Sequence, residues 1–95
     1  MDTENPRPTA LLISPDDNVA VVLKDFEAGE WVVAGHRRVA CLQAVPSGHK
    51  VALDLVQLGG RIVKCGVPVG LARRAIDAGE HVHIHNVASR YITDH

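Results

Sequence analysis

A chain of 95 residues with a net charge of −1 is the size of one small domain, and it lacks the basic cluster that nucleic-acid-binding proteins usually carry. No apolar run of the sequence approaches the roughly 20 residues of a membrane span, so we expect no membrane partner. The two cysteines, Cys41 and Cys65, match no zinc or dithiol spacing and predict reduced thiols in a cytoplasmic protein.

The first part of the chain predicts a leader followed by two strands. Residues 1–9 are polar and rich in proline, so we expect a flexible N-terminal leader. Strands are predicted at residues 10–13 and 19–23, because both runs are apolar. Residues 14–18 separate them and consist of turn formers, namely Ser, Pro, Asp and Asn.

A recurring phrase then appears along the chain. Residues 26–32 and 76–82 match position by position in residue type, residues 45–51 form a looser third copy, and residues 58–63 form a fragment of a fourth. Each copy predicts a tight turn with a glycine that leads into a strand. The intervals between copies are uneven, which argues against a solenoid and favours an irregular all-β domain.

The remaining segments follow the same rhythm. We predict a polar hinge at residues 35–38, one helical turn at 54–58, a break at Gly66 and Pro68, and a polar tail over residues 89–95. Residues 69–76 are assigned to a strand, although Leu71–Ala75 has a helix-forming composition. Further strands are predicted at residues 30–34, 39–45, 49–53, 61–64 and 81–87. Because valine is the commonest apolar residue and aromatic residues make up 3%, the fold class is mostly β, a single small domain over residues 10–88 with little helix.

Three histidines alternate with apolar residues near the C-terminal end. In a strand, His81, His83 and His85 would share one face, and Val82 and Ile84 the other. One interpretation is a solvated polar face opposite an apolar inner face. The other is a metal or substrate site, since histidine titrates near neutral pH and binds metals. Neighbours two apart lie about 6.5–7 Å from each other, so two of the three could share one ion without straining a regular strand.

Three segments of the chain resemble a known family. Gly48–Leu53, Val63–Gly66 and Gly79–Asn86, together with Asp16–Ala20, are similar to the N-terminal module of the altronate and galactarate dehydratase family. The similarity extends over about residues 10–87. It implies a β-clip fold of the SAF superfamily, similar to antifreeze-like domains. Cys65 is a departure, because the family usually has a tyrosine between the lysine and the glycine.

The resemblance implies a lyase that works in two parts. The family removes water, or sulfite, from a hydroxy acid or sugar acid, commonly with iron or another divalent metal. The 95 residues hold no large catalytic region, so the chain resembles the stand-alone small subunits of the family, such as the alpha subunit of sulfolactate sulfo-lyase. We therefore expect a separately encoded large subunit as partner and no activity of the chain alone. Self-association into a homo-oligomer stays open as well.

Elimination beside a carboxylate needs a base, an acid and a group that stabilises the carboxylate charge. With the family motifs in view, we expect His49, Lys64 and His83 to be catalytic. Lys50 and Lys64 would hold the carboxylate of the substrate as point charges. His83 and His85 would bind the metal. His81 is less favoured, because it follows the glycine turn at the place where Trp31 stands in the matching copy, which suggests a packing position.

Two alternatives to a lyase subunit stay open. The chain could be a non-catalytic module that recognises a sugar acid, or a structural partner that stabilises another chain. An enzyme role predicts that turnover depends on His49 or His83, and a recognition module predicts that the isolated chain binds an acid. A structural role predicts that replacing histidines leaves turnover intact.

Overall fold

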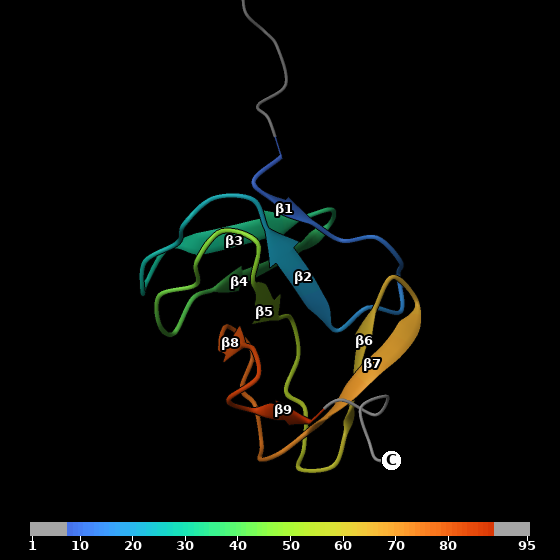
Figure 1. Ribbon diagram of the computed structural model, residues 1–95. Coiled ribbons are helices and arrows are strands. Elements are labelled where there is room, and N and C mark those ends of the chain that lie inside the picture. The colour runs from blue at the N-terminus through green and yellow to red at the C-terminus, as the bar shows by residue number, and fades with distance from the viewer. Residues whose placement is uncertain (1–7, 89–95) are drawn as a thin grey trace, which may run out of the picture.

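All regular elements in the described part of the chain are strands (Figure 1). A computed structural model describes residues 8–88, so the predicted tail, residues 89–95, lies outside the described residues, as does most of the predicted leader, residues 1–9. Within residues 8–88 there is no helix, and hence none that could cross a membrane. The predicted mostly β fold is confirmed. The strands of these residues are β1 (Ala10–Leu11), β2 (Val19–Val22), β3 (Trp31–Ala34), β4 (Arg37–Ala40), β5 (Lys50–Ala52), β6 (Arg61–Lys64), β7 (Val67–Ala72), β8 (His81–Val82) and β9 (Val87–Ala88).

A four-stranded antiparallel sheet in the order β1-β2-β5-β8 forms the middle of the domain. Both of its faces are buried. Val19 lies opposite Ala52 and belongs to one apolar cluster, whereas Ala20 lies opposite Val51 and belongs to the other. Residues directly opposite in a sheet point to the same face, and the faces alternate along each strand. Hence two short, nearly all-apolar strands supply two separate cores.

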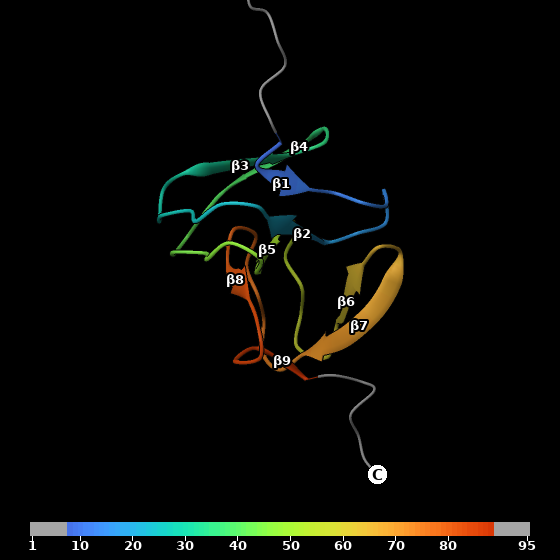
Figure 2. The ribbon, with the colours of Figure 1, turned by 45° about the horizontal axis from the view of Figure 1, so that its top comes forward.

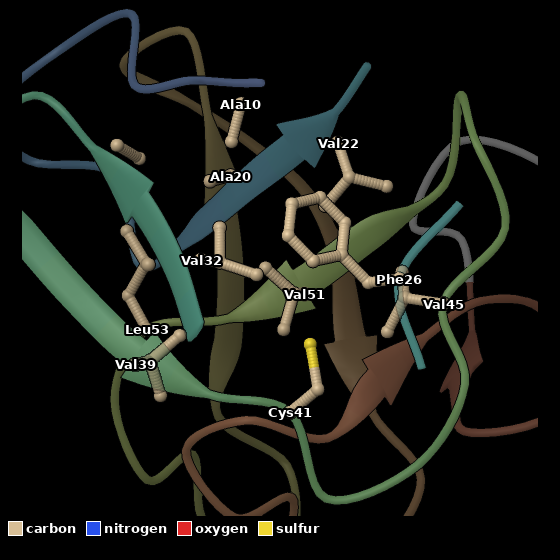
Figure 3. Close-up of a cluster of buried hydrophobic side chains, with 11 residues drawn as sticks. Ala10, Ala20, Val22, Phe26, Val32, Val39, Cys41, Val45, Val51 and Leu53 are labelled. Carbon is tan, nitrogen blue, oxygen red and sulfur yellow. The ribbon is translucent and has the colours of Figure 1, made fainter. Parts of the chain in front are cut away.

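A hairpin packs on each face of this sheet. The β3–β4 hairpin completes the first cluster, in which Val32 of β3 lies beside Val51, and Phe26 lies beside Val45 (Figure 3). The β6–β7 hairpin, extended by β9, completes the second cluster with Ile62 at its centre. Figures 1 and 2 show the two hairpins on different sides of the central strands. The molecule is therefore built as two similar halves around one shared sheet.

Four eight-residue segments, 23–30, 42–49, 53–60 and 73–80, adopt the same turn conformation. The seventh residue of each is a glycine with a positive φ of 81° to 92°, a backbone conformation that other residues enter at a cost. The residue after it donates its N–H to the carbonyl three positions earlier, at 2.7–3.1 Å. The predicted device of a glycine turn leading into a strand is confirmed in all four copies. The fourth residue of each segment is buried. These four residues form two isolated β-bridges, Phe26 with Val45 and Val56 with Ile76.

The strand predicted at residues 81–87 is wrong beyond Val82. The side chain of Asn86, which is fully buried, accepts a hydrogen bond from the His83 N–H at 2.9 Å and donates one to the His81 carbonyl at 2.8 Å. These bonds close a turn, since an Asn side chain can imitate a backbone partner. Ile84 is consequently 75% exposed instead of facing inward.

Other predicted boundaries also changed. The strand expected at residues 39–45 ends at Ala40, and the helical turn expected at 54–58 is instead one of the four turn segments, held by the bridge between Val56 and Ile76. Pro68 does not break the chain but lies inside β7 opposite Val63 of β6. The strand assignment for residues 69–76 is confirmed as far as Ala72. The strands expected at 10–13, 19–23, 30–34, 49–53 and 61–64 are present, some of them shorter.

Candidate functional site

A cavity of about 340 Å³ opens between the central sheet and the β6–β7–β9 sheet. Its apolar wall comes from the second core cluster and its edges. The polar groups are Lys50 from β5, Lys64 from β6 and His83 from the turn after β8. The lining is completed by Ile62, Val69, Val82, Ile84 and Val87. A few converging polar groups in an apolar hollow are typical of small-ligand sites.

Both lysines reach the cavity because of strand periodicity. Lys64 follows the fully buried Ile62 by two positions in β6, so the two side chains share the inward face. Lys50 lies opposite Val82 in the β5–β8 register and shares its face as well. Neither side chain is fully exposed, as both lysines are half-buried.

The charge in this cavity is positive. Burial lowers the pKa of Lys50, and the nearby positive charge of Lys64 lowers that pKa further. The ion pairs among residues 8–88 join Lys24 to Glu30, Arg37 to Asp54 and Arg74 to Glu80, so within that range no carboxylate neutralises either lysine of the cavity. Two cations that have no carboxylate partner among residues 8–88, in a partly apolar hollow, favour an anionic ligand.

Asp17 and Asn18 hold the strand that carries Lys64. The Asp17 carboxylate accepts hydrogen bonds from the N–H groups of Cys65 (3.0 Å) and Gly66 (2.8 Å) at the β6–β7 turn. Asn18 accepts one from the Val63 N–H and donates one to the Arg61 carbonyl, each at 2.8 Å. The turn is itself constrained, since Cys65 has a φ of +57°. The end of β6 is therefore fixed from outside its own hairpin.

Next to the cavity, the imidazole rings of four histidines gather. His49 Nδ1 and His81 Nε2 lie 2.8 Å apart, within hydrogen-bond distance. The His49 ring stacks on that of His83 with centroids 4.0 Å apart, and His85 lies beside His81 at 5.1 Å. Burial, followed by the charges of His49, His85, His83 and Lys50, lowers the pKa of His81 to about 4. Burial and then His49, Lys50 and His85 lower the pKa of His83 as well. These two imidazoles are thus held in their neutral form, which can accept a proton or bind a metal.

Comparison with known proteins identifies the family to which this arrangement belongs. Residues 8–90 match the family model described as the altronate/galactarate dehydratase SAF domain. The chain belongs to this family. It is 44% identical over 70 residues to altronate dehydratase of Escherichia coli strain K12, a match that covers 74% of this chain and 14% of that protein.

Two further relatives of the SAF-domain family differ in how much of them is matched. Galactarate dehydratase (L-threo-forming) of the same E. coli strain is 32% identical over 81 residues, which cover 83% of this chain and 15% of that protein. The (2R)-sulfolactate sulfo-lyase subunit alpha of Chromohalobacter salexigens is 35% identical over 82 residues, covering 79% of this chain and 87% of that subunit. The chain therefore spans about one seventh of the dehydratases but most of the sulfo-lyase subunit.

Most of the site residues that were predicted from the family motifs lie together in the structure. Lys50, Lys64 and His83 line one cavity, and His49 stacks on His83 at its edge. His85 does not line the cavity, and its exposed side chain lies against His81 instead. The roles assigned to these five residues from the sequence stay predictions.

His81 is the residue that sequence reasoning undervalued. Its assignment as a packing position depended on Trp31 in the matching copy, yet Trp31 is 55% exposed, with the Arg38 guanidinium 4.7 Å from its ring centroid. His81 instead lies in the imidazole cluster, with its N–H bonded to Gln43 Oε1 at 2.9 Å. The sequence did contain one signal for a role of His81, namely the three histidines within residues 81–85. That signal holds whether or not the segment is a strand. The Asp17 and Asn18 contacts were also missed, because their partners lie more than 40 residues away.

Proposed function

We propose that this chain is the small subunit of a two-subunit lyase that removes water, or sulfite, from a hydroxy acid together with a separately encoded large subunit. The observation that carries the proposal is the match over 87% of a sulfo-lyase subunit alpha, a protein that is named as one subunit of an enzyme. In the dehydratases the matching module makes up 14–15% of the protein, so most of each of those proteins lies outside the match. We place the enzyme in the cytoplasm, where the free thiols Cys41 and Cys65 would stay reduced.

The cavity beside Lys50 and Lys64 is the proposed binding site for the carboxylate of the acid. Its volume of about 340 Å³ suits a small sugar acid or hydroxy acid. Ammonium groups attract a carboxylate as point charges, and the apolar wall strengthens this attraction by excluding water. The absence of a competing carboxylate within residues 8–88 supports this role.

Neutral His83, at the edge of the cavity, is the proposed base. It would take the proton on the carbon next to the carboxylate, and the electron pair of that C–H bond would move toward the carboxylate, where the two lysines stabilise the added charge. The bond from the neighbouring carbon to oxygen, or to sulfur, then breaks. Hydroxide takes up the proton that His83 gained and leaves as water, which returns His83 to its neutral form. Sulfite leaves as such, and the proton on His83 then passes to the solvent. His49 lies against His83 and would pass protons to and from it.

The test uses the complex of this chain with its large subunit, taken from the neighbouring gene. Lys64→Met is expected to lower kcat/KM roughly 10- to 100-fold, since it removes one charged hydrogen bond worth about 1.5–3 kcal/mol. His83→Ala is expected to lower kcat more than it raises KM, because a proton transfer is lost. Lys24→Met is the matched control, since Lys24 is an exposed lysine that faces Phe26 and Glu30 instead of the cavity.

Three results would each point elsewhere. Wild-type turnover in both site variants, with the complex intact, would favour a purely structural partner. Binding of a sugar acid by the isolated chain, with no turnover when any large chain is added, would favour a recognition module. Equal losses in Lys24→Met and Lys64→Met would show that general charge, and not the cavity, matters.

A further inference from the structure

Three histidine side chains converge from two separate parts of the chain. His49 ends one turn segment just before β5, His81 begins β8, and His83 follows β8. Each residue offers one ring nitrogen, and these three nitrogens all lie within 4.8 Å of one another. All three side chains are half-buried. The convergence is a consequence of the β5–β8 pairing, in which His81 lies opposite Val51.

The backbone at each of these histidines is fixed by a separate hydrogen bond. The His49 N–H donates to the Pro46 carbonyl at 3.0 Å, the His81 N–H to Gln43 Oε1 at 2.9 Å, and the His83 N–H to Asn86 Oδ1 at 2.9 Å. Ligand sites need rigid support of this kind, because loosely held ligands bind metals weakly. Only the rings have to turn for the three nitrogens to face one point.

The distances between the nitrogens suit a small divalent ion. Around a tetrahedral ion with metal–nitrogen distances of 2.0–2.1 Å, neighbouring nitrogens lie about 3.3–3.4 Å apart. His49 Nδ1 and His81 Nε2 lie 2.8 Å apart, at hydrogen-bond distance. An ion bound between them would replace this hydrogen bond, and the two nitrogens would separate by about half an ångström. The ligand nitrogen of His83 lies within 4.8 Å of the other two, and it would come closer to them when the His83 ring turns.

We infer that His49, His81 and His83 form a binding site for a divalent transition-metal ion, such as zinc or ferrous iron, within this chain alone. Three imidazoles that leave a coordination position open are typical of catalytic sites, and imidazole suits zinc, iron and copper better than magnesium or calcium. The ligand set differs from the pair His83 and His85 expected from the sequence, since His85 is exposed and lies outside the set of three. His83 belongs both to this set and to the cavity, so an ion here would lie beside the proposed carboxylate site. Because a ring nitrogen bound to the ion cannot take up a proton, His83 and His49 would serve as ligands in the metal-bound chain, and their proposed proton-transfer roles apply to the metal-free chain alone.

This inference does not depend on the lyase proposal, because it concerns the isolated chain. The experiment titrates the chain, without a polyhistidine tag, with Zn²⁺ by calorimetry and with Co²⁺ by visible absorption. The wild-type chain is expected to bind one ion per chain and to give the d–d bands of a tetrahedral cobalt site. His81→Gln is expected to weaken binding at least about 100-fold, since even changes around the ligands of a metal site cost about 10- to 100-fold.

Two histidine variants serve as controls. His85→Gln and His36→Gln, the latter in the exposed β3–β4 turn, are expected to bind the ion like the wild type. Far-UV circular dichroism of each variant checks that the fold is intact, and His49→Gln gives a second ligand variant if His81→Gln does not fold. The inference is overturned if the wild-type chain binds neither ion at micromolar concentration, if a folded His81→Gln or His49→Gln variant binds like the wild type, or if His85→Gln loses binding as severely.

Discussion

Asp17 is a buried carboxylate, 2% exposed, whose hydrogen bonds join the turn before β2 to the turn between β6 and β7. Burial alone would raise its pKa, but hydrogen bonds from the N–H groups of Gly66, Ser14 and Cys65 outweigh burial and hold the pKa below its usual value. A carboxylate with a lowered pKa in the folded state stabilises the fold above its unfolded pKa, and this contribution is lost as the pH falls through the folded pKa.

We therefore predict that Asp17→Asn destabilises the domain by about 1–3 kcal/mol at pH 7. An amide turns an N–H group toward backbone donors that need an acceptor, and a buried donor left without an acceptor costs about that much. Urea unfolding at several pH values is the measurement. The gap between wild type and variant should narrow below about pH 4, where the carboxylate begins to gain its proton in the unfolded chain.

The exposed neighbour Asp16 provides the control for this variant. Asp16→Asn is expected to change stability by less than about 0.5 kcal/mol, as is usual for a surface substitution. A gap between wild type and Asp17→Asn that stays constant down to pH 2 would contradict the role of the charge.

At the site, residue types could be predicted but their partners could not. Lys50, Lys64, His49 and His83 were chosen from family motifs, and the structure brings them to one cavity edge. His81 was set aside, because its place in the repeat matches that of Trp31, which suggested a packing position. The number of histidines was visible in the sequence, whereas their convergence depends on the pairing of β8 with β5.

Among the elements, the four turn segments share one backbone but differ in what surrounds their glycines. Gly29 and Gly79 have nearly equal φ values, +91° and +92°. A Cβ added at Gly29 would meet no atom within 4 Å, whereas one added at Gly79 would overlap the carbonyl oxygen of Ala40 and crowd Leu42. The two positions therefore separate backbone strain from steric overlap.

We predict that Gly29→Ala costs about 1–2 kcal/mol, which is the cost of a left-handed conformation for a residue with a Cβ. Gly79→Ala should cost several kcal/mol more than Gly29→Ala, because backbone must shift as well. Thermal unfolding of both variants gives the comparison. Equal melting temperatures for the two variants would contradict this prediction, because the backbone at Ala40 would then shift at no cost in stability.

The turn segments were also the elements that the sequence predicted best. A glycine next to small and polar residues determines a tight turn through local conformational preference, so residues 26–32 and 76–82 were recognised as equivalent. Residues 54–58 were misassigned, because their strand-like pairing depends on Ile76, 20 residues away from Val56. The turn at His83 was missed for a similar reason. The Asn86 side chain accepts the hydrogen bond of the His83 N–H in place of a neighbouring strand, and composition alone does not predict this contact.

At the scale of the whole molecule, residues 19–49 and 50–80 repeat the same order of strand, turn, hairpin and turn. The second half carries the two cavity lysines, whereas the imidazole cluster joins His49, the last residue of the first half, to histidines that directly follow the second half. The site lies near the surface of a domain that has its own two cores, so the domain does not need a partner to shape the cavity.

We predict that the chain folds alone and also forms a stable complex with the large subunit. Size-exclusion chromatography with light scattering on the chain, on the large subunit and on their mixture gives the masses of all species. A new species that contains both chains, and that alone turns over the hydroxy acid, is the expected result. Separate elution of the two chains at micromolar concentration would contradict the two-subunit arrangement, and a larger mass for the chain alone would reveal self-association.

The shared central sheet also has a consequence for how fast the domain forms. β2 of the first half pairs with β5 of the second half, and β5 also pairs with β8, which follows the second half. A turn glycine adds to this, since the Gly79 carbonyl of the second half accepts a hydrogen bond from the Leu42 N–H of the first half. Such distant pairings lose the entropy of closing long loops before their contacts contribute stabilising energy. All-β domains of this kind therefore fold in about milliseconds to seconds. Neither half is expected to persist as a folded intermediate, so the nascent chain would remain open until β8 has emerged.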